Sequence, residues 1–67
     1  MKNVRIIGLG LMGTNLGINL ISKGIKVYGE DVNNYANNRA NKAGIDINKT
    51  DEVVDLTILA MLSLIHI

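Results

Sequence analysis

An apolar strand that runs directly into the stretch Gly8-Leu9-Gly10-Leu11-Met12-Gly13 constrains the fold more than any other feature of the chain. Val4-Arg5-Ile6-Ile7 precedes the glycines, and a segment with apolar residues at helical spacing follows them. A second short apolar strand then ends beside Asp31. The pattern Gly-x-Gly-x-x-Gly between a strand and a helix, with an acid after the next strand, is typical of a strand-helix-strand unit that binds a dinucleotide.

Each glycine of the motif has a role that a side chain would prevent. Gly8 allows a sharp turn out of the strand, Gly10 allows the backbone to approach a pyrophosphate, and Gly13 allows close packing of helix on strand. The helix expected to begin near residue 11 has no Ser, Thr, Asp or Asn at its entrance, so its first N–H groups lack a side-chain cap. A pyrophosphate would satisfy these donors and interact favourably with the helix dipole. We therefore predict cofactor contacts from Gly8, Leu9, Gly10, Leu11, Met12 and Gly13.

Asp31 is expected at the carboxyl end of the second strand, where the adenosine ribose would lie. A carboxylate there accepts hydrogen bonds from the 2′-hydroxyl of NAD. It repels the 2′-phosphate of NADP by about 4 kcal/mol for unit charges ~4 Å apart at an effective dielectric constant of ~20. Val32 and Asn33 follow the acid, where NADP sites usually have Arg. The sequence therefore favours NAD over NADP, with Glu30 as the alternative acid and a solvated turn as the alternative interpretation of Asp31.

Strand and helix signals alternate along the chain. Strands are expected at residues 3–7, 25–30, 45–47 and 56–62. Helices are expected at 11–23, between an Asn33 cap and Gly44, and briefly after a Thr50 cap. The order β-α-β-α-β-α-β is the first half of a Rossmann doubly wound parallel α/β sheet, so residues 1–61 are predicted to be a partial NAD(P)-binding domain.

The amphipathic pattern of the two longer helices predicts which residues face the core. In the first helix, Met12, Leu16, Leu20 and Ile21 lie at helical spacing and are predicted to be core residues. In the second, alanines form a narrow packing stripe, and the asparagines are predicted to form the solvated face; these are Asn33, Asn34, Asn37, Asn38 and Asn41.

Composition argues against several other classes of function. A net charge of +1 gives no electrostatic reason to expect nucleic acid or a membrane surface as a partner. Without cysteine there is no disulfide framework or thiolate metal site, and the single histidine, His66, cannot form a metal site alone. The apolar run 53–67 contains Asp55 and is shorter than the ~20 residues that span a bilayer. We expect a cytoplasmic protein with no bound metal.

The last six residues read Leu-Ser-Leu-Ile-His-Ile. They match a translation of CTG TCT CTT ATA CAC ATC, which is similar to the transposon mosaic end used to tag sequencing libraries. We expect residues 62–67 to be a sequencing-adapter tail attached to a truncated fragment whose natural sequence ends near Met61. A genuine chain end with the same residues is the alternative. Ser63 and His66 are accordingly assigned to no site.

The glycine motif and the helix after it resemble the N-terminus of the β-hydroxyacid dehydrogenases. Within residues 8–20, Met-Gly-x-Asn-Leu-x-x-Asn is most similar to the 6-phosphogluconate dehydrogenase branch, whereas the hydroxyisobutyrate branch usually has Pro in place of Asn15. Residues 29–33 are similar to the acid-bearing segment associated with NAD, while NADP-dependent members more often have Asn-Arg-Thr. Residues 55–61 resemble the family's fourth strand, which normally continues into Leu-Pro or Val-Pro.

This resemblance implies what the full-length enzyme would do. It would oxidise the 3-hydroxyl of 6-phosphogluconate, a sugar acid phosphate, pass the hydride to the nicotinamide, release carbon dioxide and form a homodimer. The family's base is a lysine near Ser-Gly-Gly and Lys-x-x-Asn motifs, and neither motif occurs in this chain. We therefore expect the chain to hold half of a cofactor site and no catalytic residue.

Two alternative functions fit the same pattern. One is a 3-hydroxyisobutyrate-type dehydrogenase or another reductase. The other is a non-catalytic, NAD-sensing regulatory domain of a potassium transport system, which also begins with a strand, the glycine motif and a ribose-binding acid. Met12 and the pair Asn15 and Asn19 favour the dehydrogenase, because the sensor domains more often have an aromatic residue just before the third glycine.

Overall fold

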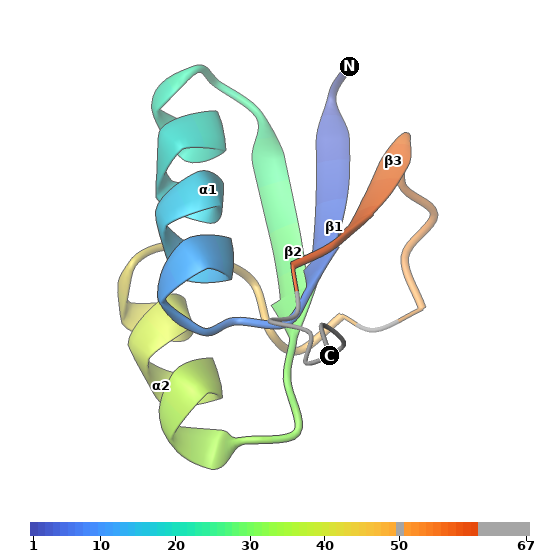
Figure 1. Ribbon diagram of the computed structural model, residues 1–67. Helices are drawn as coiled ribbons and strands as arrows, with labels where there is room; N and C mark the ends of the chain where they lie inside the picture. The colour runs from blue at the N-terminus through green and yellow to red at the C-terminus, as the bar shows by residue number, and fades with distance from the viewer. Residues whose placement is uncertain (50, 61–67) are drawn as a thin grey trace, which may run out of the picture.

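The computed structural model describes residues 1–49 and 51–60 of the chain. Three parallel strands form one sheet in the order β2-β1-β3, and both helices lie on the same side of it (Figure 1). In chain order the elements are β1 (Asn3–Ile7), α1 (Leu11–Ser22), β2 (Lys26–Glu30), α2 (Asn34–Lys42) and β3 (Leu56–Leu59). This arrangement confirms the α/β class and the first half of a doubly wound sheet.

The core lies between the sheet and the two helices. Val4 and Ile6 of β1 and Val27 of β2 are fully buried, and they share a side of the sheet because β1 and β2 are paired in that register. Ile45, which follows α2, is fully buried in the same cluster. Helix α1 packs closely on this cluster because Gly17 has no side chain: a Cβ there would lie 2.5 Å from Cδ1 of Ile45.

Local signals set the ends of the helices as the sequence predicts. Asn33 caps α2, since its side-chain oxygen accepts hydrogen bonds from the amides of Tyr35 at 2.8 Å and Ala36 at 3.2 Å. Gly24 and Gly44, which follow α1 and α2, have φ of 85° and 104°. A residue with a side chain rarely adopts this conformation, so these glycines end the helices.

The third expected strand, residues 45–47, is reduced to a single bridge. Asp46 pairs with Tyr28 on the outer side of β2, and its amide donates to the carbonyl of Val27 at 2.9 Å. The Asp46 side chain then accepts a hydrogen bond from the amide of Asn48 at 2.9 Å, and such a turn ends an extended segment. The pairing order is nevertheless that of half a doubly wound sheet, with residue 46 outside β2 and β3 on the other side of β1.

The prediction of a third helix is wrong for residues 51–55, which are not helical; Thr50, its expected cap, lies outside the described residues. The cause is Arg5, which is only 8% exposed on the sheet face opposite the helices. Its guanidinium donates to the carbonyl of Glu52 at 2.7 Å and to that of Lys49 at 3.3 Å. A buried guanidinium needs such acceptors, so this segment bonds to the sheet instead of closing a helical turn.

The fourth expected strand, residues 56–62, is observed as β3 at Leu56–Leu59. Its predicted last two residues and the predicted adapter tail, 62–67, lie outside the described residues. The tail therefore stays a prediction.

Asp55 joins the start of β3 to the start of β1. Its Oδ2 accepts hydrogen bonds from the amide of Lys2 at 2.7 Å and from that of Asn3 at 3.2 Å. These two bonds hold the pKa of Asp55 below its ordinary value of 3.8. A carboxyl whose pKa is lowered by folding stabilises the fold above its unfolded-state pKa, and this contribution is lost as the pH falls through the folded-state pKa.

We therefore predict that Asp55→Asn lowers the free energy of unfolding near neutral pH and makes its acid dependence shallower, so that the variant and unaltered curves converge at low pH. Urea unfolding followed by circular dichroism from about pH 7 to about pH 2 measures this. Asp51→Asn removes an equal charge from the same segment without touching this contact, and serves as the control. Parallel curves for Asp55→Asn and the unaltered chain would contradict the prediction.

Candidate functional site

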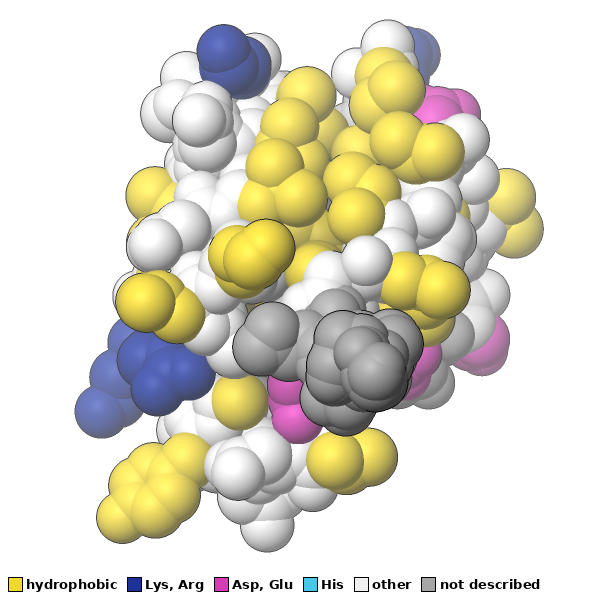
Figure 2. Space-filling model, in the orientation of Figure 1, with side chains coloured by type: hydrophobic (Ala, Val, Ile, Leu, Met, Phe, Trp, Pro, Cys, Tyr) yellow, Lys and Arg dark blue, Asp and Glu magenta, His cyan; other side chains and the backbone are white. Residues whose placement is uncertain are grey.

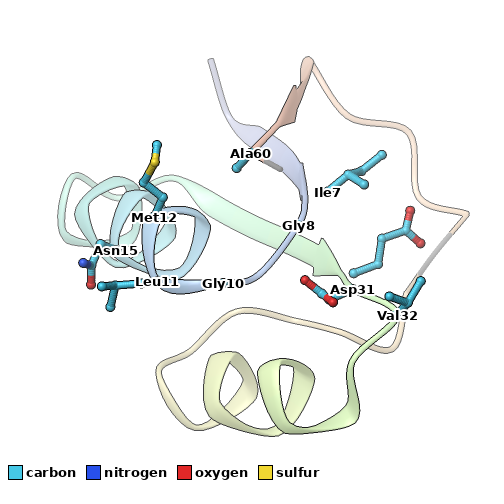
Figure 3. A pocket seen from close by; sticks show the side chains of 10 residues that line it. Ile7, Gly8, Gly10, Leu11, Met12, Asn15, Asp31, Val32 and Ala60 are labelled. Carbon is cyan, nitrogen blue, oxygen red and sulfur yellow. The ribbon is translucent and has the colours of Figure 1, made fainter. Parts of the chain in front are cut away.

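A cleft lies where β1 and β2 end and α1 begins (Figure 3). Its volume is about 920 Å³, which is in the size range of small-molecule and cofactor sites. Ligands of doubly wound sheets bind at this edge, beyond the carboxyl ends of the strands. The cleft is lined by Ile7, Gly8, Gly10, Leu11, Met12, Asn15, Glu30, Asp31, Val32 and Ala60.

The three glycines of the motif are needed for different physical reasons. Gly8 has φ of 104°, so the turn itself selects glycine. A Cβ on Gly13 would overlap the carbonyl oxygen of Gly8, so the packing of α1 on β1 also selects glycine. Gly10 has φ of −70°, and apart from its chain neighbours no atom of the described part of the chain lies within 4 Å of a Cβ built on it. The described part of the fold therefore accepts a side chain at Gly10, whereas a ligand bound in the cleft would exclude one.

The first turn of α1 presents to the cleft amides that have no acceptor among residues 1–49 and 51–60. Gly10 is the N-cap and gives no side-chain hydrogen bond, and the amide of Thr14 is the one that bonds to the Gly10 carbonyl, at 2.9 Å. The amides of residues 11–13 precede this bond and have no acceptor within the helix. The first turn contains no acidic residue. This end of α1 thus combines free donors with the positive end of the helix dipole, the combination that binds phosphate groups.

Asp31 lies beside these donors, between the glycine loop and α2 (Figure 3). One carboxylate oxygen accepts from the amide of Leu9 at 2.6 Å and the other from the amide of Asn33 at 2.8 Å. A carboxylate offers about four acceptor positions, so each oxygen can accept a further hydrogen bond from a ribose hydroxyl. Glu30, the alternative acid, lines the same cleft.

The side chains of Leu9 and Met12 are placed differently from what the sequence predicts. The Leu9 side chain is fully buried, so this residue can contribute to a ligand site through its backbone alone. Met12 was expected in the core but is 68% exposed and lines the cleft. Helical spacing correctly predicts the core positions of the partly buried Leu16, Leu20 and Ile21. It fails for Met12, which lies in the first turn of α1 at the cleft.

Asn37 corrects the prediction of a wholly solvated asparagine face on α2. It is half-buried, and its Nδ2 donates to the carbonyl of Asp31 at 2.9 Å. Its Oδ1 is buried with no hydrogen-bond partner in the part of the chain that the structure describes. Asn37 thus fixes the backbone of the acid to α2, a contact between segments that helical periodicity does not signal.

Two further supporting residues were not identified from the sequence. The hydroxyl of Thr14, which is 5% exposed, donates to the carbonyl of Leu9 at 2.9 Å. The guanidinium of Arg39 in α2 donates to the same carbonyl at 3.3 Å. A polar side chain directly after the third glycine was the available signal for Thr14, because that position of α1 faces the strand.

The surroundings of the cleft are apolar on one side and polar on the other. Figure 2 shows apolar side chains gathered between α1 and β3, with one group of acidic side chains on the side toward α2 and others along the edge of the view away from the helices. Among residues 1–49 and 51–60, no cluster of His, Asp and Glu could hold a metal ion. No helix in these ranges is long and apolar enough to cross a bilayer.

A protein-family model described as the NAD binding domain of 6-phosphogluconate dehydrogenase matches residues 3–65. The chain belongs to this family. No curated protein and no solved structure matches it significantly. Membership of the family agrees with the uncapped helix and the Gly-x-Gly-x-x-Gly turn. The family is one of NAD(P)-binding domains of oxidoreductases.

The contrast between Gly10 and Gly13 leads to a prediction. Gly10→Ala should leave the free energy of unfolding within about 1 kcal/mol of the unaltered value and should weaken dinucleotide binding at least roughly tenfold, because the methyl group occupies the space of the pyrophosphate. Gly13→Ala should instead destabilise the fold by several kcal/mol, on the order of other overpacked sites. Urea unfolding and calorimetric titration with NAD separate the two effects.

Asn41→Ala, a substitution at an exposed residue of α2, is the control for both measurements. If Gly10→Ala bound NAD as the unaltered chain does, the pyrophosphate would not lie over Gly10.

Proposed function

We propose that the chain is the cofactor-binding part of an NAD-dependent 6-phosphogluconate dehydrogenase and that it holds the adenosine diphosphate half of NAD. The observation that carries this proposal is that two complementary groups face one cleft. They are the first amides of α1, which have no acceptor within the helix, and the carboxylate of Asp31. The first suits a pyrophosphate and the second a ribose diol. The match to the family model supports it.

The residues of the chain would bind and orient the cofactor. The amides of residues 11–13 would donate to pyrophosphate oxygens, and Gly10 would allow the backbone to come within hydrogen-bond distance of them. Asp31 would accept hydrogen bonds from the ribose and so fix the direction in which the dinucleotide lies. When bound, the nicotinamide ring supplies the hydride acceptor for the oxidation.

The substrate of the full-length enzyme is inferred from the sequence around the first turn of α1. Met12 and Asn15, which carry the resemblance to the 6-phosphogluconate dehydrogenase branch, both line the cleft. The substrate would be a sugar acid phosphate. The enzyme would act as a homodimer, and other parts of the protein would supply its catalytic groups. Asn15 favours this proposal over a hydroxyisobutyrate-type dehydrogenase, and Met12 with the pair Asn15 and Asn19 favours it over a sensor domain.

The preference for NAD follows from the charge at Asp31. The residues that follow it, Val32 and Asn33, are uncharged and exposed, so neither offers a cation to a 2′-phosphate. A phosphate placed beside the Asp31 carboxylate would be repelled, and solvent and salt would reduce this repulsion without removing it.

We predict that the unaltered chain binds NAD at least roughly fivefold more tightly than NADP, since two unit charges ~4 Å apart repel by ~1 kcal/mol even in bulk water. Asp31→Asn should bring the two affinities close together. Calorimetric titration of the chain with each dinucleotide measures the ratio.

Glu30→Gln is the matched control, because it neutralises the neighbouring carboxylate of the same cleft. If Glu30→Gln removed the preference and Asp31→Asn kept it, Glu30 would be the ribose ligand. Tighter binding of NADP by the unaltered chain would refute the proposed cofactor.

A further inference from the structure

The peptide groups of Leu9 are held from both sides by side chains of other segments. Its amide donates to Oδ2 of Asp31 at 2.6 Å. Its carbonyl accepts from the hydroxyl of Thr14 at 2.9 Å and from the guanidinium of Arg39 at 3.3 Å. The side chain between these groups is fully buried. Leu9 is therefore fixed through its amide, its carbonyl and its side chain.

The position of Leu9 in the loop makes this fixation relevant to ligand binding. Leu9 lies between Gly8, in a conformation that glycine alone adopts readily, and Gly10, the N-cap of α1. Glycine loses more conformational freedom on ordering than any other residue, so a loop with two glycines is costly to hold in one geometry. A loop that is already held binds its ligand without that cost.

We propose that Thr14 and Asp31 are positioning residues for the phosphate-binding loop, acting through the Leu9 peptide groups. The inference rests on the proposed function, since it concerns the same pyrophosphate site. It gives Asp31 a second role besides accepting hydrogen bonds from the ribose hydroxyls. Its carboxylate also orients the loop that binds the phosphates, through the hydrogen bond from the Leu9 amide. Thr14 lines no part of the cleft and acts only through Leu9.

Asp31 has two opposite effects on a bare pyrophosphate. Its negative charge repels the anion, whereas its hydrogen bond to Leu9 orders the amides that bind it. The charge effect is screened by salt, because the Debye length falls from about 10 Å at 0.1 M to about 3 Å at 1 M. The hydrogen bond is short and lies within the fold, so salt affects it much less.

The test measures binding of inorganic pyrophosphate, which has no ribose and therefore reports on the loop alone. Thr14→Val keeps the shape of the side chain and removes the hydroxyl, and Thr14→Ser keeps the hydroxyl. We expect Thr14→Val to weaken pyrophosphate binding about fivefold, the equivalent of one ordinary hydrogen bond, and Thr14→Ser to bind as the unaltered chain does. Asp31→Ala should bind more weakly than the unaltered chain at high salt.

Val27→Ala is the control for stability, because it creates a cavity in the core of β2 without touching the loop. If loss of stability alone weakened binding, this variant would weaken it as well. Equal binding by Thr14→Val and Thr14→Ser would overturn the inference and leave the proposed function intact, provided that the unaltered chain binds pyrophosphate. If the unaltered chain did not bind pyrophosphate, both would be overturned.

Discussion

The contact between the start of α1 and the end of β1 is the constraint on which the rest of the structure depends. Gly8 turns the chain at a φ that favours glycine, and Gly13 lies so close to the Gly8 carbonyl that no side chain fits between them. This contact directs the Leu9 side chain into the core and leaves the first amides of α1 at the edge of the sheet. The same packing that begins the core therefore creates the ligand site.

The two faces of the sheet are stabilised in different ways. The helix side is an apolar cluster of small and branched side chains. On the opposite side, the Arg5 guanidinium and the Lys26 ammonium lie 5.8 Å and 5.4 Å from the centre of the Tyr28 ring, and Lys26 pairs with Asp46 at 3.6 Å. Cation–π contacts and hydrogen bonds from Arg5 thus take the place of a covering helix, and they hold the segment that returns the chain to β3.

This division also explains what the sequence could predict. The glycine turn, the Asn33 cap and the glycines that end both helices are local signals, in which neighbouring residues decide the conformation, and the structure confirms them. The loss of the third helix depends on Arg5, far away in the sequence. Asn37 likewise bonds to a different segment. Spacing along one helix carries no information about such partners.

The site divides in a similar way between residues that the fold requires and residues that only a ligand requires. Gly8, Leu9 and Gly13 are each explained by backbone conformation or packing, so their presence alone does not indicate a cofactor. Gly10 is different, because the space around it is open and its φ is ordinary. Residue 10 is also the N-cap of α1, where Ser, Thr, Asp or Asn would supply a side-chain hydrogen bond that glycine does not. A chain selected for stability alone could have a capping side chain at residue 10, so this glycine is the strongest physical evidence for a phosphate ligand.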